Sequence, residues 1–158
     1  MIKLANFFVS LSFAGYIKII PPGTFASFLS IIILFPIVEY KIISLEIFVV
    51  IFFVIFLLSL FFINKFSSHN QSHDSKIIVI DEFLGIYLIL LFYDQIKIIN
   101  PYVTMILIFI LFRFFDILKV FPANIVDKRL KSAFGVILDD LIAGIYTIII
   151  LYIVNAYY

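Results

Sequence analysis

Apolar residues fall into five long runs along the 158-residue chain, and short polar stretches separate them. A helix needs about 17–25 residues to cross a bilayer. The second and fifth runs are long enough to span, and the other three are shorter candidates. In chain order the runs are Thr24–Val38, Leu45–Ile63, Ile77–Tyr93, Tyr102–Leu118 and Phe134–Tyr157.

The N-terminal stretch "MIKLANFFVSLSFAG" is apolar but short, and Asn6, Ser10 and Ser12 interrupt it. This pattern predicts an interfacial or packed helix ahead of the first span. A secretory signal peptide is the alternative interpretation. No linker divides the chain, so we expect one membrane-embedded domain over residues 1–158. Its fold class is all-α, a polytopic membrane helical bundle of about five spanning or near-spanning helices plus an N-terminal helix.

Composition supports a membrane protein and excludes several functions. Hydrophobic residues make up 65% of the chain, charged residues 13%, and the formal net charge is +1. Such a chain lacks the basic face that nucleic-acid binding requires, so we expect no nucleic-acid partner. Without cysteine there is no disulfide, iron–sulfur cluster or thiol nucleophile. His69 and His73 are the only histidines, which makes a zinc site improbable.

The basic residues predict the orientation of the bundle in the membrane. Lysine and arginine concentrate in cytoplasmic loops of membrane proteins. A cytoplasmic N-terminus would leave only Lys41 and Lys97 outside, with Arg113 inside a span. The cytoplasmic side would then hold Lys3, Lys18, Lys65, Lys76, Lys119, Lys128, Arg129 and Lys131. The distribution therefore favours an N-terminus inside and a C-terminus outside.

Polar residues that a lipid-facing helix would avoid fall at the predicted cytoplasmic ends of several spans. Asp81 and Glu82 start the third span, and Asp139 and Asp140 start the fifth. Charges inside a membrane are costly, and they mark functional sites by default. We therefore expect these acids to converge on one membrane face. Helix-end charges at the membrane edge are the structural alternative.

The fourth span carries Arg113, Asp116 and Lys119 at its predicted cytoplasmic end, at spacings that bring them near one helix face. Buried carboxylates beside cations suit a hard divalent cation such as Mg²⁺ together with a phosphate ligand. Gly23 and Thr24, after Pro21-Pro22, could offer backbone N–H groups to the same phosphate. A purely structural Arg113–Asp116 ion pair and a plain capped turn remain the alternatives. Gly85 and Gly144 would allow neighbouring helices to approach closely.

Four motifs together resemble the phosphatidylglycerophosphatase A family of bacterial membrane lipid phosphatases. They are "PPGTFAS", "VIDEFLG", "FRFFDILKVFP" and "DKRLKSAFGVILDDLIAGIY", and the resemblance runs from about Gly15 to Tyr146. The chain departs from the family pattern at Ala26, Val120 and Ser132-Ala133, where the family usually has Gly, Pro and a Gly pair. These departures affect backbone freedom in turns and leave the ionisable groups in place.

The resemblance implies a Mg²⁺-dependent enzyme of the bacterial inner membrane that converts phosphatidylglycerophosphate to phosphatidylglycerol. It implies a catalytic and metal-binding set and a phosphate-binding set of residues. The first set is Asp81, Glu82, Asp116, Asp139 and Asp140. The second set is Gly23, Thr24, Arg113, Lys119 and Lys131.

Three other functions compete with this interpretation. A CDP-alcohol phosphotransferase is also membrane-embedded and Mg²⁺-dependent, but its longer Asp-Gly signature is absent from the chain. A small ion-coupled transporter would spread its acids across the depth of the bilayer. A structural subunit would tolerate the loss of all of these acids.

Overall fold

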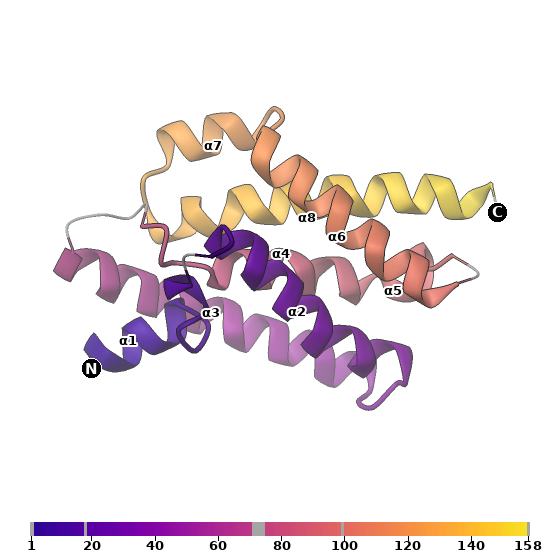
Figure 1. Ribbon diagram of the computed structural model, residues 1–158, viewed down its shortest axis with the longest axis horizontal. Helices are drawn as coiled ribbons and strands as arrows, with labels where there is room; N and C mark the ends of the chain where they lie inside the picture. The colour runs from indigo at the N-terminus through magenta and orange to yellow at the C-terminus, as the bar shows by residue number, and fades with distance from the viewer. Residues whose placement is uncertain (1, 18, 71–74, 99, 158) are drawn as a thin grey trace.

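The computed structural model describes residues 2–17, 19–70, 75–98 and 100–157, and it is all-α over these residues (Figure 1). The helices are α1 (Ile2–Val9), η1 (Ala14–Tyr16), α2 (Pro22–Glu39), α3 (Leu45–Asn70), α4 (Ile80–Leu91), α5 (Tyr93–Ile96), α6 (Pro101–Leu118), α7 (Ala123–Arg129) and α8 (Ala133–Ala156).

Four helices in the described part of the chain, α2, α3, α6 and α8, are long and apolar enough to cross a membrane. This confirms the predicted membrane bundle but corrects the number of spans. The third predicted segment, Ile77–Tyr93, contains only the 12-residue helix α4. At 1.5 Å per residue α4 is about 18 Å long, well short of the roughly 30 Å hydrocarbon core. The break at Phe92, followed by the single turn of α5, ends the helix early.

Helix α4 can be short because other helices enclose it. It packs against α2, α3, α6 and α8, and eight of its residues are buried. Its companions α2 and α6 both begin with proline at the first helical turn, where the missing N–H costs nothing. The Asn100 side chain caps α6, and the Ser132 hydroxyl caps α8 by accepting from the Gly135 N–H at 3.2 Å. Ser132, where the family usually has Gly, therefore contributes to the start of α8.

Two glycines let α4 and α8 approach closely, as the sequence predicts. A Cβ atom on Gly85 would lie 2.5 Å from the Phe112 ring and 3.1 Å from the Asp140 carbonyl oxygen. A Cβ on Gly144 would lie 3.0 Å from the carbonyl oxygen of Gly85. Because the Phe112 ring is fully buried, Gly85 has no room for a side chain, and a Cβ atom on Gly144 would make a tight contact with the α4 backbone.

The N-terminal helix packs against the bundle. Helix α1 lies along α3, with Ala5 and Val9 fully buried, and the Val79 N–H donates to the Val9 carbonyl at 2.9 Å. This agrees with the predicted packed helix. The contact also holds the segment that leads into α4, so α1 helps to place the first residues of that helix.

The order of the helices brings polar residues together at one end of the bundle. The chain runs back and forth, so α2, α4 and α8 begin, and α6 ends, on the side where α7 lies in Figure 1. The α2–α3 loop, α5 and the C-terminus lie toward the opposite end. The predicted convergence of polar groups at one end is therefore confirmed for the described residues.

Substitution of Gly85 tests the close packing of α4 against its neighbours. We expect Gly85→Ala to lower the free energy of unfolding by about 1–3 kcal/mol, because overpacking displaces Phe112 or separates the helices. Thermal unfolding of the detergent-solubilised protein measures the change. Ala156→Val, at an exposed position on α8, is the control and should unfold like the parent protein. An unchanged unfolding temperature for Gly85→Ala would contradict the described packing.

Candidate active site

A cavity of about 600 Å³ opens among the polar ends of α2, α4, α6, α7 and α8. Six acidic and four basic side chains line it, which gives a formal charge of −2. The acidic residues are Asp81, Glu82, Asp116, Asp127, Asp139 and Asp140, and the basic residues are Lys76, Arg113, Lys119 and Lys131. The excess of carboxylates makes the lining more attractive to cations than to anions.

Three of the carboxylates lie within reach of a single ion. One oxygen from each of Asp81, Glu82 and Asp140 lies within 4.8 Å of the other two. The oxygens come from the first turn of α4 and from α8, which the glycine contacts hold together. The Oε2 atom of Glu82 is buried without a hydrogen-bond partner in the described structure. A hard divalent cation fits this oxygen-only donor set and would provide the missing partner.

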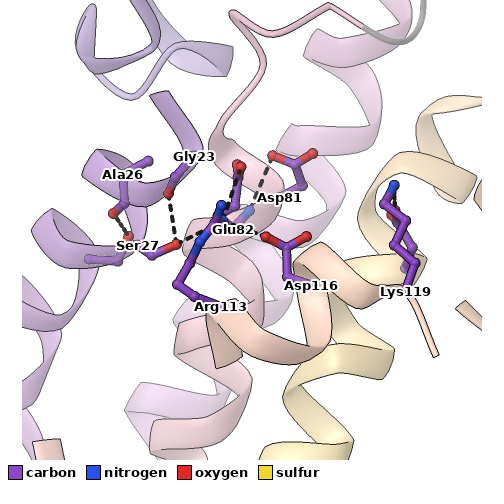
Figure 2. A network of polar contacts seen from close by, with 10 residues as sticks. Gly23, Ala26, Ser27, Asp81, Glu82, Arg113, Asp116 and Lys119 are labelled. Carbon is purple, nitrogen blue, oxygen red and sulfur yellow. Dashed lines mark hydrogen bonds and ion pairs between the residues drawn. The ribbon is translucent and has the colours of Figure 1, made fainter. Parts of the chain in front are cut away.

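Arg113 connects Asp116 to the first turn of α4 (Figure 2). Its guanidinium forms an ion pair with Asp116 one turn away, and Nη1 lies 3.9 Å from Glu82 Oε1. Nη1 also lies 3.5 Å from Ser27 Oγ, which itself donates to the Gly23 carbonyl at 2.8 Å. All three charged side chains are about one-seventh exposed. The group therefore joins α4 and α6 by ion pairs and α2 by hydrogen bonds, within a mostly apolar bundle.

Gly23 leaves space for the Glu82 carboxylate where α2 begins. A Cβ atom on this residue would collide with Oε1 of Glu82 and would lie 3.1 Å from Arg113 Nη1. The glycine thus allows the backbone at the start of α2 to approach the charged group. Helix N-termini carry unsatisfied N–H groups and a positive dipole end, which favours an anion there.

Lys119 links Asp139 to Asp127, an acid that was not predicted from the sequence to belong to the site. Its Nζ atom bonds Asp139 Oδ2 at 2.7 Å and also bonds Asp127 Oδ1. Burial alone would lower the pKa of Lys119, but the hydrogen bonds and charges of Asp127 and Asp139 outweigh it and raise this pKa above its usual range. Lys119 therefore stays a cation at any physiological pH.

The backbone of Lys119 is unusual. Its φ of 44° and ψ of 59° place it in the left-handed region as the C-cap of α6. Glycine is the common residue at such a position, and other L-residues pay roughly 1–2 kcal/mol there. The conformation turns the chain from α6 toward α7 and directs the ammonium group into the cavity.

Nine of the ten predicted site residues line this one cavity, and Thr24 does not. The predicted five-acid metal set divides in the structure. Asp81, Glu82 and Asp140 form the group with metal-binding spacing, whereas Asp116 and Asp139 each pair with a cation. Their assignments to catalysis and metal binding stay predictions. His73 and the side chain of His69 lie outside the described residues.

Four polar residues at or beside the cavity were not predicted, namely Ser27, Ser75, Lys76 and Asp127. Ser27 and Asp127 lie within the motifs "PPGTFAS" and "DKRLKSAFGVILDDLIAGIY", so position in those motifs was the available signal. Asp127 resembles any surface acid in a basic stretch. In the structure, Asp127 lines the cavity and pairs with Lys119.

The fold and the cavity define a helical membrane protein with a charged internal site at one end of its helices. The chain belongs to the phosphatidylglycerophosphatase A family, because that family's sequence model matches residues 7–155.

Two curated relatives carry the name phosphatidylglycerophosphatase A. The protein of Haemophilus influenzae is 37% identical over 83 residues, which is 52% of this chain and 48% of the relative. That of Escherichia coli K12 is 30% identical over 83 residues, which is 52% of this chain and 46% of the relative. The matched stretch thus spans about half the length of these curated relatives. No solved structure matches the chain significantly.

Two substitutions of Lys119 separate its backbone from its side chain. Lys119→Gly and Lys119→Ala both remove the ion pairs, but only glycine adopts the left-handed conformation without strain. We expect Lys119→Gly to be more stable than Lys119→Ala by roughly 1 kcal/mol. Chemical or thermal unfolding in detergent measures the difference. Equal stability, or a more stable alanine variant, would contradict the left-handed C-cap.

Proposed function

We propose that this chain is a Mg²⁺-dependent phosphatase that hydrolyses phosphatidylglycerophosphate to phosphatidylglycerol and inorganic phosphate. The observation that carries the proposal is the position of the Asp81, Glu82 and Asp140 carboxylates within 4.8 Å of one another, beside Arg113. Membership in the family and the names of the curated relatives support the same substrate.

The three carboxylates would hold the divalent cation. When bound, Mg²⁺ supplies Lewis-acid polarisation and offsets the charge of the phosphate. One divalent ion would also bring the cavity's formal charge of −2 to zero. The carboxylates fit this role because the buried Glu82 Oε2 has no other partner among the described residues.

Arg113, Lys119 and Lys131 line the same cavity and would bind the phosphate oxygens. Arginine suits this role because its planar guanidinium offers several donors in a fixed geometry. The first N–H groups of α2, at Gly23 and Thr24, lack intrahelical acceptors and would add donors at the edge of the site. Together these groups would hold the phosphorus where a water molecule can attack it.

Hydrolysis then exchanges one bond to phosphorus for another. The water oxygen forms a bond to phosphorus while the ester P–O bond breaks. The attacking water loses one proton and the departing glycerol oxygen gains one, which yields phosphatidylglycerol and inorganic phosphate. The cations that face the phosphate stabilise the negative charge that develops during this exchange.

We also propose that the cavity opens toward the cytoplasm and that the protein resides in the bacterial inner membrane. Helix α1 and the cavity lie at one end of the bundle, together with the C-terminal part of α3, which carries Lys65, and with Lys76, Lys119 and the basic residues of α7. The α2–α3 loop and the segment after α5, at the opposite end, carry Lys41 and Lys97. This asymmetry supports a cytoplasmic N-terminus by the positive-inside rule.

The transporter alternative receives less support. An ion path would place acids at several depths across the bilayer. In the described residues the six cavity acids instead gather at one end, where five helices supply the lining. No observation in the structure favours the CDP-alcohol phosphotransferase or the structural subunit.

Purified protein in detergent should release phosphate from phosphatidylglycerophosphate with Mg²⁺ and should stop when EDTA removes the metal. We expect Asp140→Asn to reduce kcat/KM by at least about 100-fold, because it removes one of three carboxylates that bind the ion. Asp94→Asn is the matched control, since Asp94 is 58% exposed and pairs with Lys41 and Lys97 at the opposite end.

Full turnover by Asp140→Asn, or turnover that persists in EDTA, would contradict the proposed metal-dependent site. A folded parent protein that releases no phosphate from the lipid with any divalent cation would contradict the proposed activity itself.

A further inference from the structure

The two carboxylates that bind Lys119 differ in their exposure to solvent. The Asp139 side chain is 9% exposed and belongs to the long helix α8, whereas that of Asp127 is 38% exposed and belongs to the seven-residue helix α7. Lys119 itself is 35% exposed. One of its bonds is therefore desolvated and the other lies at the boundary between cavity and solvent.

This difference determines which bond can be exchanged. Removal of a partner from a buried charge leaves that charge without compensation, which is strongly unfavourable. An exposed ion pair is worth little, because water solvates both groups when they separate. The Lys119–Asp139 bond should therefore persist, and the Lys119–Asp127 bond can open at low cost.

A phosphate group has the properties needed to replace the Asp127 carboxylate. Both are anions with oxygen acceptors, and both form short charge-assisted bonds with an ammonium group. Phosphate carries more charge, and Lys119 is anchored on its other side by Asp139 and by the turn at the end of α6. Asp127 also adds to the negative charge of the cavity that an entering phosphate must overcome.

We propose that the Asp127 carboxylate occupies the phosphate-binding side of Lys119 as a competing anion until the substrate phosphate replaces it. The inference rests on the proposed function for the identity of the substrate, but it requires only that phosphate binds in the cavity. The two acids that bind Lys119 then have different roles. Asp127 leaves Lys119 when phosphate enters, and Asp139 stays bound to it.

The proposal predicts a gain in binding when Asp127 is neutralised. Asp127→Asn removes the competing anion, so inorganic phosphate should bind about two- to fivefold more tightly, as expected for an exposed ion pair. A residue that merely supported the fold of α7 would have the opposite effect. The KM for the lipid should fall by a similar factor without an increase in kcat.

The experiment is calorimetric titration of the detergent-solubilised protein with inorganic phosphate in the presence of Mg²⁺. The variants are Asp127→Asn, Lys119→Met and the double variant, with Asp94→Asn as the control for loss of one exposed acid. In the Lys119→Met background, Asp127→Asn should give a smaller gain in phosphate affinity, because no ammonium group remains for the two anions to share and only the loss of one cavity charge acts.

Three results would overturn the proposal: weaker or unchanged phosphate binding in Asp127→Asn, an equal gain in the Lys119→Met background, or no phosphate binding by any variant. Lipid hydrolysis by the parent protein, assayed in parallel, keeps the two hypotheses distinct. Normal hydrolysis with unchanged phosphate affinity in Asp127→Asn rejects only the exchange. Tighter phosphate binding by a protein that does not hydrolyse the lipid rejects only the proposed function.

Discussion

Every charge placed inside an apolar helical bundle needs a partner, because water is not available to solvate it. In this protein Arg113 forms an ion pair with Asp116, and Lys119 forms one with Asp139. The remaining group of Asp81, Glu82 and Asp140 has more negative charge than the nearby Arg113 can offset. This imbalance supports the proposal that a cation binds among the three carboxylates.

The packing of the short helix α4 makes this arrangement possible. Because Gly85 and Gly144 allow α4 and α8 to touch through their backbones, the acids at the start of each helix come within reach of one another. The neighbouring helices cover the rest of α4, so it does not need the length of a lipid-facing span. Its first turn can then remain at the cavity while its apolar body fills the centre of the bundle.

The hydrophobic pattern placed the long helices, but it ended the second one at Ile63, whereas α3 continues through polar residues to Asn70. The predicted Tyr102–Leu118 is observed as Pro101–Leu118. The hydrophobic pattern overestimated the length of the third helix, because an enclosed core helix and a spanning helix are equally apolar. The convergence of the acids also followed from the sequence, through their position at helix ends. The ion pair between Asp127 and Lys119 could not be predicted from the sequence. It depends on a left-handed turn at Lys119 that no residue pattern indicates.

We propose above that the three carboxylates of the cavity share one divalent cation. Crystals grown with Mn²⁺ in place of Mg²⁺ would test it most directly, because anomalous scattering locates this ion independently of any assumed mechanism. We expect a strong anomalous peak among the carboxylate oxygens of Asp81, Glu82 and Asp140. A peak elsewhere in the bundle, with these three carboxylates free of metal, would contradict it.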